Sequence, residues 1–294
     1  MNLTDKQKGI ALSIIGVLLI TPDSLFIRLI SISSWELVFY RGLVPFICLF
    51  VLLFFYYKTK LVHSLVVTGL PGLLYAILIA LGSSAFVISI ENTNVANTLI
   101  MVALTPFATA ILSSIFLKEH PNKRMWLTII ACFFVMLFIF YDSYQGNRIF
   151  GDLFGLATAI LVGGSAVVVR YGKVINFLPA LLLAKVFTMI IALSLIQYFP
   201  ESLFIEGRDI YLIIAMGVIA VFIPLTLITL APRYIPAYEV EIFFVLETIL
   251  GPIWVWFIVH EQPSTKTIVG GICIILIILA HTFSELNSRD SHKH

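Results

Sequence analysis

The stretch FFVLETILGPIWVWFIVHEQPS, from Phe243 to Ser264, places one carboxylate, Glu247, inside an otherwise apolar run. A run of about 20 apolar residues is long enough to cross a bilayer as a helix. An acidic residue near the centre of such a helix costs about 3 kcal/mol, so it marks either a functional position or an acid hydrogen-bonded to a neighbouring helix. The run ends at HEQP (260–263), a polar segment that predicts a turn.

The rest of the chain has the same apolar character. Of its 294 residues, 60% are hydrophobic and 12% are charged, against about 25% charged in soluble domains. The mean hydropathy is +1.06. The net charge of +2 and the lack of a basic stripe with interleaved aromatic residues predict no nucleic-acid partner. Cys48, Cys132 and Cys273 lie far apart in apolar runs, which predicts neither a disulfide framework nor a metal site.

Ten apolar runs are long enough to cross a bilayer, and they leave almost no chain for a soluble domain. The sequence therefore predicts an all-α membrane protein with ten transmembrane helices. The predicted spans are approximately 9–28, 35–57, 65–90, 94–117, 125–142, 151–171, 177–199, 209–231, 235–259 and 267–284.

The positive residues predict the orientation of these spans. With the N-terminus in the cytoplasm, twelve of the 18 Lys and Arg residues fall on the inner side and four on the outer side. Inner loops of membrane proteins carry an excess of Lys and Arg. We therefore expect a multi-pass protein of the cell (inner) membrane with cytoplasmic N- and C-termini. The first run is too long for the core of a signal peptide and lacks a cleavage site, so it is expected to stay as a helix.

An internal repeat divides the chain. An offset of 142 residues carries the apolar runs of the first half onto those of the second without a gap, with Gly9 on Gly151, Arg28 on Arg170 and EHP (119–121) on EQP (261–263). This predicts two five-helix units, residues 1–143 and 144–294. Because five is odd, the second unit enters the membrane in the opposite sense. Such inverted repeats allow transporters to alternate access to a site near the midplane.

Three segments resemble the EamA family of the drug/metabolite transporter superfamily. SWELVFYR (34–41) resembles the start of the family's second helix, LTP (104–106) through FLKE (116–119) its fourth, and LE (246–247) through VHE (259–261) its ninth. There are two departures: Thr248 stands where the family usually has Pro, and Leu183 faces Arg41 across the repeat. The resemblance implies ten helices in an inverted repeat and transport of small metabolites, amino acids or drugs, without naming a cargo.

Charged side chains within spans are the first candidates for function, because they face one another or a wet cavity. Lys185 lies about eight residues into its span and needs a carboxylate, a cavity or an anionic substrate group. Burial favours the neutral form of Glu247, which suits a group that carries a proton or pairs with a cationic substrate. The predicted substrate-binding residues are Glu36, Tyr40, Arg41, Asn94, Asn97, Met101, Ser165, Lys185 and Glu241, with Glu247 as the coupling residue.

Each of these residues also has a structural interpretation. Glu36 and Tyr40 lie four residues apart on one helix face and can clamp two helices, and small residues such as Ser165 often mark close helix packing. Arg28, at the end of a span, is expected to reach the interface or to pair with Asp23 or Glu36. Acidic residues at the span ends, Glu119 and Glu261, are expected to accept hydrogen bonds from the next helix.

These observations predict a secondary active transporter of a small polar metabolite, with an amino acid or amino-acid derivative favoured because acidic and basic groups are mixed. With no Walker motif, we expect proton coupling or exchange, and no cofactor or metal. The alternatives are a drug or toxic-metabolite exporter of the same fold, or a non-transporting membrane protein such as a lipid scramblase. No HExxH or GxSxG motif is present, so an enzyme is not expected. The expected partners are the lipid bilayer and a small-molecule substrate, for a monomer or homodimer.

Overall fold

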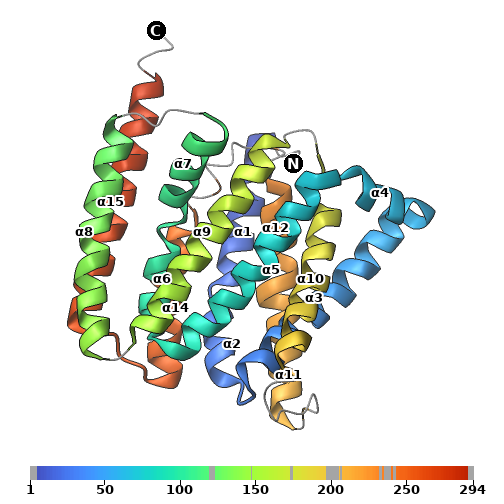
Figure 1. Cartoon of the computed structure of the whole chain (residues 1–294), viewed down its shortest axis with the longest axis horizontal. Helices are drawn as coiled ribbons and strands as arrows, with labels where there is room; N and C mark the ends of the chain where they lie inside the picture. Colours follow the sequence, from blue (N-terminus) through green and yellow to red (C-terminus); the bar gives the residue numbers. More distant parts are fainter. Residues whose placement is uncertain are drawn as a thin grey trace.

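The structure is a computed structural model that describes residues 5–118, 123–146, 148–172, 175–196, 205, 207–231, 234, 240 and 243–290. All regular elements in these residues are helical, and none of these residues lies in a strand. The first turn of α1 and the last turn of α15 lie at the same end of the bundle (Figure 1). The helices are α1 (Asp5–Ile20), α2 (Asp23–Leu29), α3 (Ser34–Tyr57), η1 (Lys58–Lys60), α4 (Leu61–Val67), α5 (Gly69–Asn92), α6 (Val95–Val102), α7 (Thr105–Phe116), α8 (Lys123–Gln145), α9 (Ile149–Tyr171), α10 (Leu178–Ile196), α11 (Arg208–Ala215), η2 (Met216–Phe222), α12 (Ile223–Leu230), α14 (Val245–Val259) and α15 (Thr265–Asp290).

Seven helical segments of the described chain are long and apolar enough to cross a membrane. Shorter apolar helices overlap the other three predicted spans: Trp126–Phe138, Leu246–Val259 and Thr265–Ile277. The prediction of an all-helical protein with several membrane-spanning helices is therefore confirmed, while the count of ten spans stays a prediction. The seven segments are Gln7–Leu29, Ser34–Val67, Gly69–Asn92, Val95–Phe116, Ile149–Tyr171, Leu178–Ile196 and Arg208–Leu230.

The outside of the bundle is covered by large apolar side chains. Phe55 on α3, Phe134 on α8 and Phe257 on α14 are each well over half exposed. Extensive exposed apolar surface marks contact with a membrane or another protein. Because seven helical segments are also long enough to cross a membrane, this apolar surface fits contact with the hydrocarbon of a bilayer.

Three of the predicted spans are interrupted rather than continuous. The sequence predicts one helix over 9–28, but α1 ends at Ile20 and α2 begins at Asp23, because Pro22 has no backbone N–H to continue the ladder. The fourth span divides into α6 and α7, with Pro106 in the first turn of α7. The eighth contains the π-helix η2, directly before Pro224 in α12. Interrupted helices often line the central sites of transporters.

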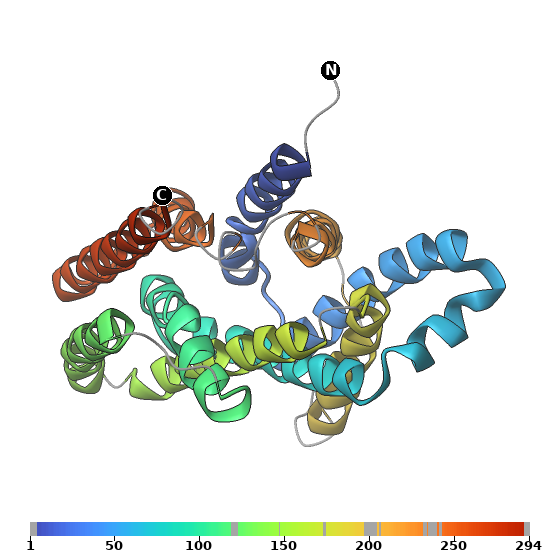
Figure 2. The ribbon, with the colours of Figure 1, turned by 90° about the horizontal axis from the view of Figure 1, so that it is seen from above.

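Elements from the two predicted repeats are interleaved. The helix α5 packs along α9, and α10 packs against both α3 and α5. Seen from above, the pair α8 and α15 forms one edge of the bundle, and α3 with α4 forms the opposite edge (Figure 2). The broken first helix therefore stands between these edges, next to α14 and α12.

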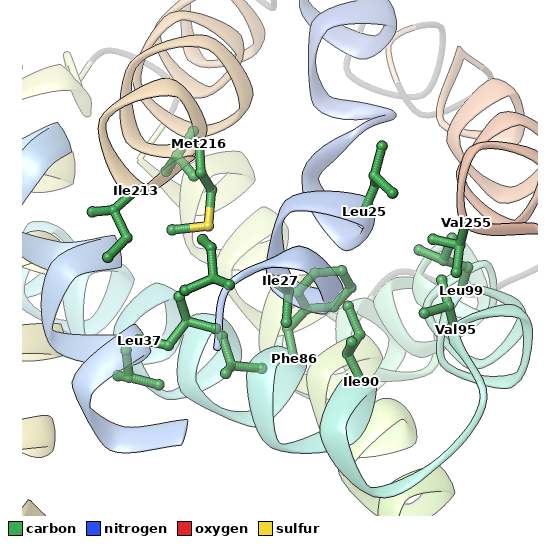
Figure 3. Packing of buried hydrophobic residues seen from close by; sticks show 14 of the residues in the cluster. Leu25, Ile27, Leu37, Phe86, Ile90, Val95, Leu99, Ile213, Met216 and Val255 are labelled. Carbon is green, nitrogen blue, oxygen red and sulfur yellow. The ribbon is translucent and has the colours of Figure 1, made fainter. Parts of the chain in front are cut away.

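An apolar cluster joins the broken first helix to both halves of the chain (Figure 3). Leu25 and Ile27 of α2 lie in this cluster with Phe86 of α5, Met216 of η2 and Val255 of α14. All five side chains are buried. Their packing fixes α2 against its neighbours, although this helix has only seven residues.

Candidate functional site

A buried ion pair lies at the break in the first helix. Asp23, in the first turn of α2, accepts hydrogen bonds of 2.5 Å from Nη1 and Nη2 of Arg41 on α3. The Nε of Arg41 lies 3.1 Å from Oγ of Ser83, and its guanidinium lies 5.4 Å from the ring centroid of Phe86. A bidentate pair of this kind is both strong and geometrically specific. Arg41 is thus held by α2 and α5 together.

Lys185 of α10 lies beside this pair. It is 1% exposed, and its Nζ makes no hydrogen bond with any residue that the structure describes. Arg41 and Asp23 are the charged groups that act on it. A buried ammonium without a partner is costly, so its presence inside the bundle requires a reason.

Glu247 of α14 also lies near the pair. It is 7% exposed, and Asp23 and Arg41 are the charged groups that act on it. The helix of Lys185, α10, packs against α3, which carries Arg41, and the helix of Glu247, α14, packs against α2, which carries Asp23. We call these four residues, Asp23, Arg41, Lys185 and Glu247, the central charged cluster.

The central charged cluster contains two basic groups, Lys185 and Arg41, and two acidic groups, Asp23 and Glu247. Since Asp23 and Arg41 already neutralise each other, Lys185 and Glu247 are the groups left to bind an external charge. Asp23 and Arg41 belong to the first half of the sequence, and Lys185 and Glu247 belong to the second half. A movement of one half relative to the other would therefore change the distances within the cluster.

The EamA-like transporter family matches residues 7–141 and, a second time, residues 149–283. The chain belongs to the EamA-like transporter family. The two matched ranges of this transporter are offset by 142 residues at both their starts and their ends. The family therefore covers most of the chain and agrees with the resemblance seen in the sequence.

Individual relatives of this EamA-like transporter are distant. The pseudopaline exporter CntI from two strains of Pseudomonas aeruginosa is 22% identical over 262 and 265 residues, which cover 85% of this chain and 86% of each exporter. A solved crystal structure aligns with a TM-score of 0.67 and 13% identity, over 95% of this chain and 98% of the other. The structural likeness supports the fold alone, and the family and the exporters support a membrane transporter.

Two of the predicted site residues lie at the start of α3. Glu36 forms a capping box with Ser33: the Ser33 backbone N–H donates to Glu36 Oε2 at 3.1 Å, and the Glu36 N–H donates to Ser33 Oγ at 3.3 Å. Tyr40 is half-buried, with its ring 5.3 Å from that of Phe39 in an edge-on arrangement. Of the three predicted site residues on α3, which are Glu36, Tyr40 and Arg41, only Arg41 belongs to the central charged cluster. Glu36 caps its own helix in this structure.

Asn97 belongs to a second polar network, away from the cluster. Its amide nitrogen lies 3.3 Å from Oδ1 of Asp152, its amide oxygen accepts a hydrogen bond of 2.7 Å from Thr267, and Thr93 donates to the same Asp152 oxygen at 2.6 Å. Asn97 and Asp152 are fully buried. Asn94, the N-cap residue of α6, is half-buried and makes no side-chain cap bond. This network ties α6 to α9 and α15.

The remaining predicted site residues are packed or lie outside the described part of the chain. Met101 is fully buried in an apolar cluster with Phe107 and Cys132. Ser165 donates a hydrogen bond of 2.7 Å to the Val162 carbonyl of its own helix. Glu241 falls outside the residues that the structure describes.

Two sequence-based pairings are wrong, and one residue was missed. Arg28 was expected to reach the interface or to pair with Asp23 or Glu36, but Asp23 pairs with Arg41, and Arg28 Nε lies 2.9 Å from Glu261 Oε2. Glu261 accepts a hydrogen bond from a helix N-terminus as expected, but from that of α6 rather than from the next helix. Asp23 was not chosen as a site residue, although an acid directly after a proline inside a span was a usable signal.

A surface pocket of about 580 Å³ lies elsewhere, among the ends of α3, α5 and α9. Trp35, Glu91 and Phe154 are among its lining residues, and none of the four residues of the central charged cluster lines it. Ser34 donates a hydrogen bond to Glu91 within it. We assign the candidate site to the central charged cluster, because that is where unmatched charges converge.

Proposed function

We propose that this EamA-like transporter is a secondary active transporter of a small zwitterionic metabolite, an amino acid or amino-acid derivative, which binds at the central charged cluster. The observation that carries the proposal is the buried ammonium of Lys185, which has no hydrogen-bond partner among the described residues, beside the Asp23–Arg41 ion pair, with the buried Glu247 on a helix that packs against α2. Charged residues inside spans mark substrate or ion pathways. A cargo with one positive and one negative group would satisfy both.

The roles of the four residues follow from the sign of their charges. The carboxylate of the cargo would contact Lys185 and the nearby Arg41, and its ammonium group would contact Glu247 and Asp23. A purely anionic or purely cationic cargo would leave one buried charge without a partner, which is costly in a low dielectric. The cluster therefore favours a zwitterion over a simple amine or acid.

The proposed architecture is ten spans in two inverted five-helix units, residues 1–143 and 144–294. It is supported by the two family matches with a constant offset. Alternating access would expose the central charged cluster first to one side of the cell membrane and then to the other. Both termini would be cytoplasmic, and the chain would act as a monomer or homodimer.

Coupling and direction complete the proposal. Glu247 would carry the coupling proton, or would be neutralised only by the cargo in an exchange cycle. Competition between cargo and proton for the carboxylate of Glu247 would link the flux of the cargo to the flux of protons.

Export is favoured over import as the direction of transport, because both curated relatives are exporters.

The test uses purified protein reconstituted into liposomes. Thermal stability is first measured with separate sets of amino acids, amines, carboxylic acids and lipophilic drugs. Uptake of the stabilising compounds is then measured with and without a pH gradient, for the parent protein and for Glu247→Gln. We expect zwitterions to raise the thermal midpoint, and the Gln variant to insert normally while its transport no longer responds to the gradient.

Three results would overturn parts of this proposal. Stabilisation by amines or drugs alone would favour the drug-exporter alternative. Transfer of fluorescent phospholipid between leaflets, without uptake of any small molecule, would favour a scramblase. An unchanged pH profile in Glu247→Gln would remove Glu247 from coupling.

A further inference from the structure

Arg28 and Glu261 form an ion pair between the two halves of the sequence. The Nε of Arg28 lies 2.9 Å from Glu261 Oε2, and its Nη2 donates a hydrogen bond of 2.7 Å to the Thr93 carbonyl. The other carboxylate oxygen of Glu261 accepts a hydrogen bond of 2.8 Å from the Val95 backbone N–H. We call the end of the bundle that holds these four residues the Glu261 end. One acid and one base thus join α2, the α5–α6 connection and the α14–α15 connection.

The pair connects the two elements that present the acids of the central charged cluster. Arg28 lies in the last turn of the short helix α2, and Asp23 lies in its first turn. Glu261 directly follows His260, whose left-handed backbone (φ 60°) ends α14, the helix that carries Glu247. Separation of Arg28 from Glu261 would therefore free α2 and α14 to move apart at the site.

Buried apolar side chains lie along α2 and α14 between the residues of the central charged cluster and those of the Glu261 end. In the sequence, Leu25 and Ile27 lie between Asp23 and Arg28, and Val255 lies between Glu247 and Glu261. These side chains are at most 7% exposed and belong to one packed cluster (Figure 3). Close packing of this kind leaves little room for water while α2 and α14 stay together.

We propose that the Arg28–Glu261 ion pair is a latch that holds the Glu261 end closed and that must open before the central charged cluster can exchange cargo on that side. The inference rests on the proposed function in one respect, since alternating access gives the opening its purpose. The two side chains are 23% and 21% exposed. A partly exposed ion pair shifts an equilibrium by roughly fivefold rather than by orders of magnitude, which suits a contact that breaks in every cycle.

The test is the accessibility of a single cysteine next to the cluster. Ser24 is buried, and its Oγ has no hydrogen-bond partner among the described residues, so Ser24→Cys changes little. The variant is placed in a background in which Cys48, Cys132 and Cys273 are replaced by Ala. The rate of modification by a membrane-impermeant methanethiosulfonate is measured in right-side-out and in inside-out vesicles, with no cargo added.

We expect Arg28→Gln and Glu261→Gln each to raise the modification rate by roughly fivefold, and only from the membrane side that the Glu261 end faces. Gln at position 261 can still accept the Val95 N–H, so this variant removes the charge while keeping the shape. The double variant should react no faster than the faster single variant, because both changes open the same latch. Arg28→Lys, which keeps the charge, should react more slowly than Arg28→Gln.

The matched control is Lys8→Gln, which removes one partner of the exposed Lys8–Asp5 ion pair on α1 and should leave the rate unchanged. Unchanged rates in both Gln variants, additive effects in the double variant, or equal increases from both sides would overturn the latch. The cysteine modification rates are measured without cargo, so this test of the latch does not depend on which compound is transported. A latch that opens in a protein that transports no zwitterion would disprove the proposed function alone, and transport with unresponsive cysteine rates would disprove the latch alone.

Discussion

Arg41 donates two hydrogen bonds of 2.5 Å, one to each carboxylate oxygen of Asp23, across the contact between α3 and the broken first helix. Both side chains are more than nine-tenths buried. The pair therefore fixes the start of α2 inside the membrane region, where an isolated charge would be costly. Lys185 lies on α10, which packs against the helix of Arg41, and Glu247 lies on α14, which packs against the helix of Asp23.

The first prediction concerns Asp23→Asn. The substitution leaves the Arg41 guanidinium buried without its anionic partner, and removal of one member of a buried pair costs about 3–5 kcal/mol. We expect a clear fall in the thermal midpoint of the purified protein and loss of transport. The double variant Asp23→Asn with Arg41→Gln should be less destabilised than the sum of the two single variants.

The control for this prediction is Asp5→Asn, whose carboxylate pairs with Lys8 on the exposed first turn of α1. Its thermal midpoint should not change, because exposed pairs contribute little to stability. Equal effects of the two Asn substitutions would contradict a special role for the buried pair.

The second prediction has the opposite sign for stability. Lys185→Met removes a buried ammonium that has no hydrogen-bond partner in the described structure and replaces it with an apolar side chain of similar length. Replacement of buried charges by well-packed apolar groups often stabilises a protein by about 1–4 kcal/mol. We expect a higher thermal midpoint together with loss of transport, the trade-off that a costly functional charge produces.

Lys8→Met, at an exposed position, serves as the control and should change neither property. A fall in the thermal midpoint of Lys185→Met would indicate that the ammonium is stabilised in the protein, and the assignment of Lys185 to a cargo would then fail.

The helices could be predicted from the sequence because the apolar runs have bilayer length. The break in the first helix could not be placed with the same rule, since TPDS (21–24) interrupts the apolar run for only four residues. Proline gives a local signal, but whether it kinks a helix or divides it depends on neighbours such as Trp254, whose Nε1 donates a hydrogen bond of 3.1 Å to Thr21 Oγ1.

The site was only partly predictable for a related reason. Arg41, Lys185 and Glu247 were identified because a charge in a span is unusual whatever surrounds it. Met101 was chosen because it follows Asn94 at helical spacing, and Asn97 because it lies beside that face, but spacing does not say what the face meets. It meets Asp152 and Gly155 of α9, which are close-packed partners from the other half of the sequence. The pairing of Arg28 with Glu261 is likewise tertiary, and no local pattern contains it.

The third prediction tests the contact that places Arg41 beside Lys185. A Cβ added to Gly42 would lie 2.8 Å from Met189 Cγ and 3.0 Å from the Lys185 carbonyl oxygen, so α3 and α10 would have to separate. Overpacking of this kind costs about 1–3 kcal/mol. We expect Gly42→Ala to lower both the thermal midpoint and the apparent affinity for cargo, because the two basic groups move apart.

Gly164 on α9 provides the matched comparison. A Cβ there would meet only side-chain atoms of Leu78 and Leu112, at 3.5 Å or more, so Gly164→Ala should be neutral or stabilising by up to about 1 kcal/mol. If the two alanine variants behave alike, close packing at Gly42 does not set the geometry of the cluster.

The last prediction combines the repeat with the proposed latch. With the offset of 142 residues, Arg28 and Glu261 correspond to Arg170 and Glu119. Glu119 lies outside the described residues, while Arg170 is in the last turn of α9, at the opposite end of the bundle from Arg28. In an inverted repeat, a contact that closes one end has its counterpart at the other.

We therefore expect Arg170→Gln to raise the modification rate of Ser24→Cys from the side opposite the Glu261 end, and to lower it from the Glu261 side or leave it unchanged. The physical reason is that weakening one closure shifts the population toward the state open on that side. The measurement uses the same two vesicle orientations as the Arg28→Gln experiment. If Arg170→Gln and Arg28→Gln increase accessibility from the same side, the two arginines are not related by inverted symmetry, and the proposed inverted arrangement of the halves would lose its mechanistic role.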